Sequence, residues 1–237
     1  MPASFFPRYR VVTNSPLSPV TMAAMGTPEQ ALRRPVIEIR GSNQRMAWVL
    51  WIVVSVIGAV VAALIAWQVR TLFLAGPAFS SQGARYAGTV VEALVAGGAQ
   101  WLVWRHYRLA VDWWVPVTVA ANLLNAIIVI PSVLRIAVGA GTSGPTASMV
   151  AGATVLAAAG LVVGTAQALV LRGPAGNTAW AWVPATIIGG AFAGAITITV
   201  SAHLFGLPYV VFLGVITALG VVLTAASQAP VVRLVLR

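Results

Sequence analysis

Few side chains in this 237-residue chain could carry out chemistry. The sequence has four acidic residues, two histidines and no cysteine. Without cysteine, a disulfide, a thiolate zinc site and a cysteine nucleophile are all excluded. The acids and histidines are too few for a metal site of three or four side chains, and no Gly-x-Ser-x-Gly nucleophile motif occurs. We therefore expect a protein that is not an enzyme and holds no metal ion.

Glu92 is the one acid that lies within a long apolar segment. An ionisable group inside a membrane span marks a functional site by default, which here would be a proton or cation site. Arg85 precedes Glu92 by about two helical turns. An ion pair with Arg85 or Arg70 near the membrane surface is the simpler interpretation, and the sequence leaves both open.

A second group of polar residues follows at helical spacing. Thr118, Asn122 and Asn125 are separated by four and then three residues, which places them on one helix face. Polar groups in spans more often serve as packing contacts between helices than as the lining of a cavity. With Glu92, these three residues form the candidate polar cavity of the sequence.

The elements that must position these residues are long apolar segments, in a chain that is 59% hydrophobic and 8% charged. Crossing a bilayer core of about 30 Å takes about 20 mostly apolar helical residues. Six segments meet this length: residues 46–69, 87–104, 113–136, 149–171, 180–202 and 208–230. The sequence therefore predicts an all-α integral membrane protein with six transmembrane helices. Pro131 should kink the third span, and Arg135, one turn later, indicates that Pro131 ends it.

The basic residues predict the orientation of these spans. All fourteen are Arg, and the net charge is +10. With the N-terminus inside, eleven Arg are cytoplasmic and three lie outside, namely Arg70, Arg85 and Arg135, which satisfies the positive-inside rule. An even number of spans then leaves both termini in the cytoplasm. Because the Arg residues flank apolar runs and do not gather on one face, nucleic-acid binding is not expected.

His106 and His203 are candidate ligands of a pigment, since neutral imidazoles commonly ligate metals. The predicted orientation puts them on opposite faces of the membrane, so they cannot share a haem. Each is otherwise an ordinary interfacial histidine. We predict no cofactor; bound lipid is expected, and contact with a pigment or a quinone is the alternative.

An internal repeat divides the spans into three helical hairpins, residues 46–105, 113–172 and 180–233. Residues 97–105 and 164–172 both read Gly-x-x-Gln-x-Leu-Val-x-Arg. A weaker third copy contains Gln228 and Arg233, and a Trp-rich segment opens each unit. The distances from Trp48, Trp113 and Trp180 to the three glutamines are 52, 54 and 48 residues. Such parallel repeats are related by an axis along the membrane normal, and a pseudo-threefold bundle is one closure; a row of hairpins is another.

Small residues and glutamines mark the faces along which these helices would pack. Small residues allow close backbone approach in lipid, and a Gln would hydrogen-bond to a neighbouring helix with a contribution of about 1 kcal/mol. The predicted packing residues are Gly97, Gly160, Gly164, Gly190, Gly194, Gln100, Gln167 and Gln228.

These motifs resemble those of uncharacterised bacterial polytopic membrane proteins that repeat a Gly-x-x-Gln-x-Leu-Val-x-Arg, Trp-Trp-Val hairpin unit. The resemblance covers the second to sixth spans. It implies a multi-span helical protein of the bacterial cytoplasmic (inner) membrane, and it implies no activity.

Residues 1–45 form a polar, Pro-rich segment that we expect to be a cytoplasmic N-terminal extension. Thr27-Pro28-Glu29-Gln30 combines an N-cap, a first-turn proline and a capping-box glutamine, which predicts a short helix near residues 28–34. Such a segment cannot bury a core of its own and offers a surface to a partner.

The leading functional hypothesis is a non-catalytic accessory or structural subunit of a larger membrane complex, such as a photosynthetic or respiratory electron-transfer complex. Its partners would be membrane lipids and other membrane subunits, contacted through the small-residue faces and residues 1–45. The alternative is a small-molecule or ion transporter or channel, with a polar path between the hairpins lined by the three glutamines and by Asn122 and Asn125.

Overall fold

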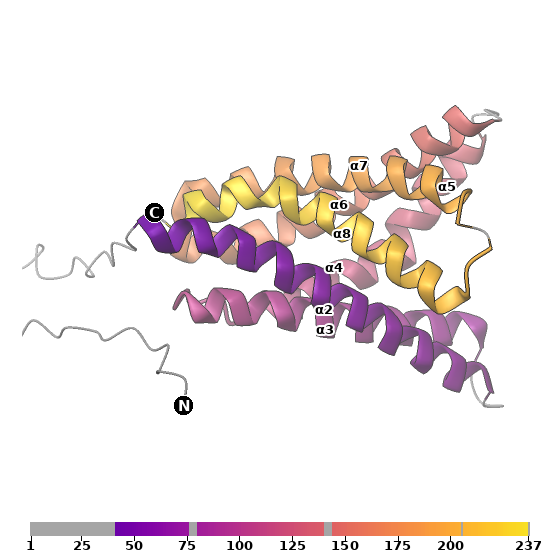
Figure 1. The fold of residues 1–237 in the computed structure, drawn as a ribbon, viewed down its shortest axis with the longest axis horizontal. Helices are drawn as coiled ribbons and strands as arrows, with labels where there is room; N and C mark the ends of the chain where they lie inside the picture. Colours follow the sequence, from indigo (N-terminus) through magenta and orange to yellow (C-terminus); the bar gives the residue numbers. More distant parts are fainter. Residues whose placement is uncertain (1–40, 76–79, 140–143, 205, 237) are drawn as a thin grey trace, which may run out of the picture. The chain divides into compact units, whose positions relative to one another are not determined.

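The computed structural model describes residues 41–75, 80–139, 144–204 and 206–236, and within these ranges it contains helices and no strand (Figure 1). The α-helices are α2 (Gly41–Ala75), α3 (Ser81–His106), α4 (Trp114–Leu124), α5 (Ile130–Gly139), α6 (Pro145–Ala175), α7 (Trp182–Ser201) and α8 (Tyr209–Val235). A π-helix η2 (Asn125–Val129) joins α4 to α5, and a 3₁₀-helix η3 (Gly176–Ala181) joins α6 to α7. The short helix predicted near residues 28–34 lies outside the described residues. Residues 41–45, assigned to the extension, belong to the first turns of α2.

Four stretches of the described chain are long and apolar enough to cross a membrane: Met46–Ala75, Trp114–Ile136, Pro145–Ser201 and Tyr209–Val235. The third of these contains both α6 and α7. Helix α3 carries Arg85, Glu92 and Arg105 and is not among the four. The protein is therefore an all-helical chain with the long apolar helices of a membrane protein.

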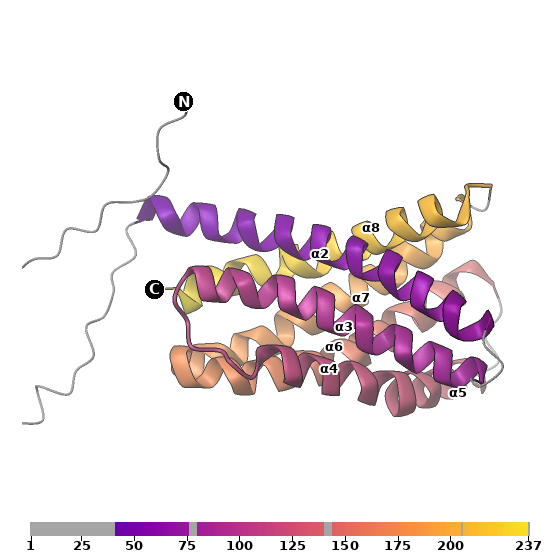
Figure 2. The ribbon, with the colours of Figure 1, turned by 90° about the horizontal axis from the view of Figure 1, so that it is seen from below.

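The helices pack around a common centre, each against its neighbours in chain order. Helix α3 packs against α2 and α4, α6 against α4 and α7, and α8 against α7 and also against α2 (Figure 2). Helices α2, α4 and α7 begin at the end of the bundle where α3, α6 and α8 finish. We call this the tryptophan end; the helices lie close together there and spread apart towards the opposite end (Figure 1).

The third predicted span, which corresponds to the stretch Trp114–Ile136, does not end at Pro131, so that prediction is wrong. Helix α5 continues through the proline to Gly139, directly after the π turn of η2. In this turn the N–H of Ile130 donates to the carbonyl of Asn125, five residues earlier. Since Pro131 has no N–H and its ring crowds the preceding turn, we attribute the continuation to this wider turn, which gives the ring room.

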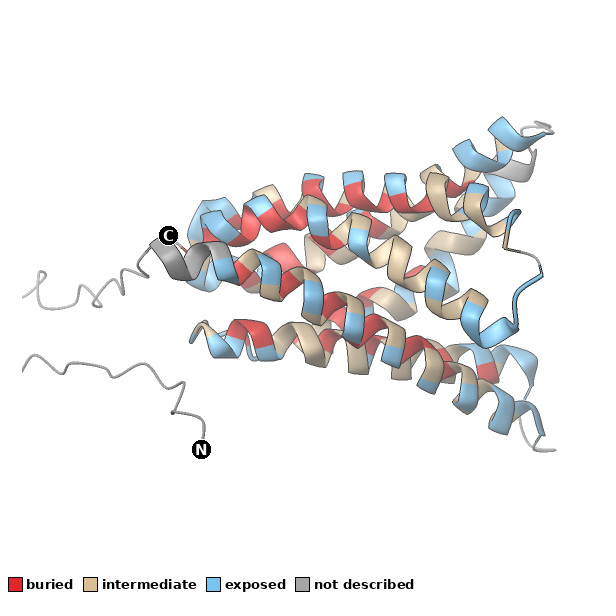
Figure 3. Cartoon of the chain, in the orientation of Figure 1, coloured by how far each residue is buried: buried red, intermediate tan, exposed pale blue. Residues whose placement is uncertain are grey.

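Burial divides each helix into an inner and an outer face (Figure 3). On α2 the exposed apolar residues recur every fourth position, at Val49, Val53, Ile57, Val61 and Ile65. This spacing places them along one side of the helix. A continuous apolar outer stripe is what a helix presents to lipid.

Candidate functional site

Four tryptophans from four helices form the core of the tryptophan end. Trp51, Trp104, Trp114 and Trp182 are each 0% exposed. Their six pairwise ring-centroid distances lie between 4.9 and 6.1 Å, and all six pairs are tilted or edge-on. Such geometry is favourable because the edge of one ring meets the face of another. We call this group the tryptophan cluster.

Two glutamines bind the indoles of this cluster. Gln167 Oε1 accepts a hydrogen bond from Trp182 Nε1 at 2.9 Å, and its Nε2 donates to Thr118 Oγ1 at 3.1 Å. Each of these side chains comes from a different helix, so one carboxamide joins α6, α7 and α4. We call this arrangement, in which an amide accepts from an indole and donates to a hydroxyl, an amide clasp.

The second clasp joins α8, α2 and α7. Gln228 Oε1 accepts from Trp51 Nε1 at 3.3 Å, and Gln228 Nε2 donates to Thr186 Oγ1 at 3.0 Å. Gln167 and Gln228 are both buried, with 2% and 4% of their surface exposed. Buried amides with both ends bonded hold helices in register, because breaking either bond leaves a polar group without a partner.

The third glutamine forms only half of this arrangement. Gln100 Nε2 donates to Ser55 Oγ at 3.4 Å. Trp114 stands where the pattern requires the indole donor, yet its Nε1 is buried without a hydrogen-bond partner. The clasp at Gln100 is therefore open.

The hydroxyl of each clasp lies four residues after a buried tryptophan: Ser55 after Trp51, Thr118 after Trp114 and Thr186 after Trp182. The predicted repeat used neighbouring tryptophans instead. Trp113 is 69% exposed and Trp180 is 41% exposed, so neither belongs to the core. The recurring Trp-x-x-x-Ser/Thr spacing was the signal that could have identified the correct residues.

The predicted small residues lie in contacts between helices of this chain. A Cβ on Gly160 would stand 2.7 Å from the carbonyl oxygen of Thr186, and one on Gly164 would stand 3.0 Å from Thr186 Cβ. At Gly190 and Gly194 a Cβ would collide with backbone carbonyls of α6. Glycine is thus required where α6 and α7 meet.

Gly97 serves the equivalent contact between α3 and α4, where a Cβ would lie 3.3 Å from Thr118 Cγ2. This distance is tight but involves a side chain, whereas the α6–α7 contacts involve backbone. The α3–α4 contact is therefore the looser of the two.

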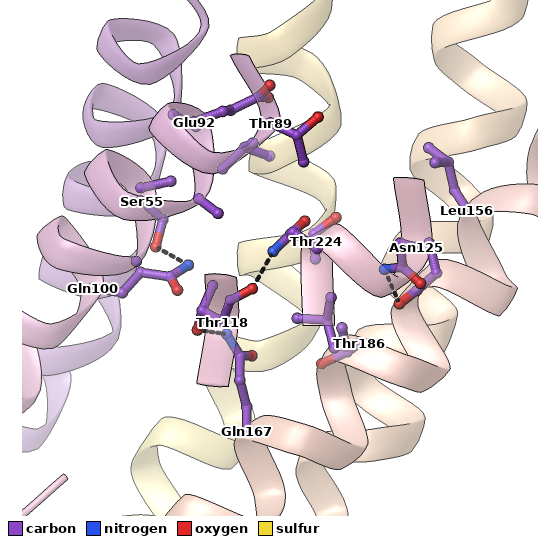
Figure 4. A pocket seen from close by; sticks show the side chains of 18 of the residues that line it. Ser55, Thr89, Glu92, Gln100, Thr118, Asn125, Leu156, Gln167, Thr186 and Thr224 are labelled. Carbon is purple, nitrogen blue, oxygen red and sulfur yellow. Dashed lines mark hydrogen bonds between the residues drawn. The ribbon is translucent and has the colours of Figure 1, made fainter. Parts of the chain in front are cut away.

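A cavity of about 410 Å³ lies between the helices next to the amide clasps. Figure 4 shows it lined by side chains from helices on all sides. The predicted polar residues line it: Glu92, Gln100, Thr118, Asn122, Asn125, Gln167 and Gln228. Ser55, Thr89, Thr186, Thr217 and Thr224, which are not among the predicted cavity residues, add hydroxyl groups.

Glu92 lines the cavity and pairs with Arg70, one of the two arginines considered from the sequence. Arg70 Nη2 lies 3.3 Å from Glu92 Oε2, and the two side chains are 32% and 45% exposed. The arginine crosses the surface of α3 at Gly88, where a Cβ would collide with it. Arg85 instead lies over the ring of Tyr86, 5.7 Å from its centroid.

The two histidines are far from this cavity's lining and from each other along the bundle. His106 ends α3 at the tryptophan end, next to Tyr107, with ring centroids 5.0 Å apart. His203 follows α7 at the opposite end, with Nδ1 3.0 Å from the carbonyl oxygen of Thr199. Both are exposed. Across the described ranges, no group of three or more His, Asp or Glu side chains could hold a metal ion.

Comparison with protein-family models, with curated proteins and with solved structures gives no match for this chain.

Proposed function

We propose that this chain is a six-span membrane protein that binds a small polar solute in its central cavity, as a transporter or channel-like protein does. The observation that carries the proposal is the cavity itself: about 410 Å³, lined by amides, hydroxyls and one carboxylate. This volume falls within the range of about 300–1,000 Å³ that small-molecule sites occupy. Glu92 is an ionisable group, and such a group costs free energy inside a membrane protein, which makes a functional reason for it the default.

The proposed topology has six spans, with both termini in the cytoplasm of a bacterial inner membrane. Its support is the distribution of charge on the bundle. Arg105, Arg172 and Arg233 fall in the last turns of α3, α6 and α8, all at the tryptophan end. By the positive-inside rule that end is cytoplasmic. The closed side of the cavity then faces the cytoplasm.

The proposed architecture is a pseudo-threefold ring of three hairpins, α2–α3, α4–α6 and α7–α8. The contact between α8 and α2 favours a ring over a row, since a row would leave the first and last hairpins apart. The bond from Trp51 to Gln228 joins the same two hairpins.

The tryptophan cluster separates the cavity from the cytoplasmic end. Gln167 and Gln228 line the cavity with their amides and hold Trp182 and Trp51 at the same time. Solute therefore enters from the opposite end, where the helices spread, and movement into the cytoplasm requires the cluster to separate. The arrangement of helices described above therefore corresponds to a state in which the cavity is closed towards the cytoplasm.

The test is stabilisation by solutes. Full-length protein in nanodiscs is heated with sugars, polyols, amino acids, alkylamines and carboxylates, and the unfolding temperature is recorded. At least one class should raise it. The Ala96→Phe variant, which fills the cavity from α3, should lose this shift. Leu94→Phe, on the outer face of the same helix, should keep it because Leu94 is 46% exposed. No stabilising solute, or an equal shift in Ala96→Phe, overturns the proposal.

The subunit role predicted from the sequence is the second candidate, favoured by the length and polarity of residues 1–45. The small-residue faces no longer call for a partner, since they are used between helices of the chain. Purification in mild detergent followed by native mass spectrometry tests this role. A monodisperse monomer without other subunits contradicts it.

A further inference from the structure

The two asparagines on the cavity wall formed by α3, α4 and η2 offer oxygen rather than nitrogen to a ligand. Asn122 Nδ2 donates to the carbonyl oxygen of Thr118 at 2.8 Å, and Asn125 Nδ2 donates to that of Ala159 at 3.1 Å. A backbone carbonyl only accepts hydrogen bonds, so it dictates which end of each amide is nitrogen. The opposite end is therefore oxygen. We call this the asparagine wall.

Asn125 Oδ1 has no hydrogen-bond partner, although the residue is only 3% exposed and lines the cavity (Figure 4). An unpaired acceptor at this burial costs about as much as a lost hydrogen bond. The π turn that begins at Asn125 places it there, and such turns are frequent at functional sites. A donor from a ligand would satisfy the oxygen.

The wall that carries the two closed clasps differs. Gln167 and Gln228 each have the amide oxygen bonded to an indole and the amide nitrogen bonded to a hydroxyl. The indoles are donors only, so these amides cannot be turned round. Their oxygens are engaged. The amide oxygens of the lining that have no hydrogen-bond partner are those of Asn122 and Asn125 on the asparagine wall and that of Gln100 in the open clasp, and of these three Asn125 Oδ1 is the buried one.

The charge of the cavity agrees with the chemistry of its free atoms. Glu92 is the one ionisable side chain among the described residues that line it, while its partner Arg70 is not part of the lining. Ala93, Ala96 and Ala126 supply apolar surface beside these polar groups. A ligand that fits has a positive, hydrogen-bond-donating group and a small carbon skeleton.

We propose that the asparagine wall binds the ammonium group of a small organic cation, with Asn122 Oδ1 and Asn125 Oδ1 accepting its N–H groups. Glu92, which also pairs with Arg70, supplies the one negatively charged side chain of the described lining. This inference rests on the proposed function and adds the class of solute. The volume of about 410 Å³ exceeds what a bare inorganic ion fills, and the apolar surface suits the carbon portion.

The first experiment compares three probes of similar size that differ in the polar group: propylammonium, 1-propanol and propionate. Each is titrated into full-length protein in nanodiscs while the unfolding temperature and the heat of binding are measured. Propylammonium should bind and stabilise, and propionate should not, because propionate cannot donate to the asparagine oxygens and its charge is repelled by Glu92. Binding of potassium ions alone, without propylammonium binding, overturns the proposal.

The second experiment removes the acceptors. Asn125→Leu and Asn122→Leu should each weaken propylammonium binding at least about tenfold, as expected for a lost bond to a charged donor. Thr154→Val is the control: it lies on the exposed side of α6 outside the cavity lining, its hydroxyl donates to Val150 within its own helix, and binding should change less than about twofold. Because Asn122 bonds only within its own helix, its variant remains informative if Asn125→Leu fails to fold.

The outcomes separate the two proposals. If Asn122→Leu and Asn125→Leu both bind propylammonium as well as the unsubstituted protein does, the assignment to this wall is wrong. If propanol or propionate binds instead and Ala96→Phe abolishes that binding, the ammonium assignment fails and solute binding stands. If no class of solute stabilises the protein, both fail.

Discussion

The contact between α6 and α7 and the contact between α3 and α4 are built from the same sequence motif but have different properties. Gly-x-x-Gln provides Gly164 and Gln167 at the first and Gly97 and Gln100 at the second. At the first, the amide clasp is closed. At the second, Trp114 Nε1 is unpaired and the clasp is open.

The cause of this difference lies outside the motif. Helices α6 and α7 bring glycines to each other over several turns, so their backbones touch. Helix α3 has Gly97 opposite a threonine side chain, and Glu92 in place of a further small residue on the cavity side. The α6–α7 contact is thus rigid, and the α3–α4 contact is looser and has polar atoms without partners. Both contacts lie beside the same cavity. Functional sites are commonly held in this way by a rigid support.

The largest difference in stability between the two contacts is expected from glycine substitution at the α6–α7 contact. Gly194→Ala should lower the free energy of unfolding by about 2 kcal/mol, because its Cβ would collide with the carbonyl of Gly152. Gly98→Ala is the control, since nothing lies within 4 Å of its Cβ position. It should be neutral or slightly stabilising. Reversible SDS unfolding measures both, and equal losses would contradict the close contact.

Removal of the glutamines should separate a closed clasp from the open one. Gln167→Leu leaves both Trp182 Nε1 and Thr118 Oγ1 without their partner and should cost about 1–3 kcal/mol. Gln100→Leu removes one long bond to Ser55 and should cost less than half as much. The same unfolding assay compares them. A larger loss at Gln100 would show that its clasp closes in the membrane.

Substitution of the indoles tests the same point from the donor side. Trp182→Phe and Trp114→Phe remove similar volume from fully buried positions. The first also leaves Gln167 Oε1 unpaired, whereas the second removes a donor that has no partner. Trp182→Phe should therefore be less stable than Trp114→Phe by about 1 kcal/mol. Thermal unfolding followed by circular dichroism measures the difference, and equal midpoints would argue against it.

The smallest effect is expected at the hydroxyls. Ser55→Ala removes an acceptor whose bond to Gln100 is 3.4 Å long and should change stability by no more than about 0.5 kcal/mol. Thr186→Val, at a 3.0 Å bond in a closed clasp, should cost more. Unfolding temperatures of the two variants in one detergent give their order of stability. A larger loss of stability in Ser55→Ala than in Thr186→Val would contradict the prediction.

The sequence predicted the helical class well, because long apolar runs leave few alternatives in a membrane. It predicted a polar cavity from Glu92, Thr118, Asn122 and Asn125 and placed the glutamines in helix packing, with a polar path as the alternative; all of these residues line the cavity. It did not distinguish Trp114 from Trp113, since both fit a Trp-rich start and their burial depends on the rotation of the helix about its axis. The ending expected at Pro131 failed because hydropathy carries no signal for a π turn.

The bond between Trp51 and Gln228 spans 177 residues and joins the first described helix to the last. Because α2 is synthesised before α8, the indole of Trp51 lacks this partner until the last helix has been made. The final fold is then complete only when the last helix arrives and fills its place. A chain truncated before α8 would therefore leave Trp51 Nε1 and Thr186 Oγ1 without their partner Gln228.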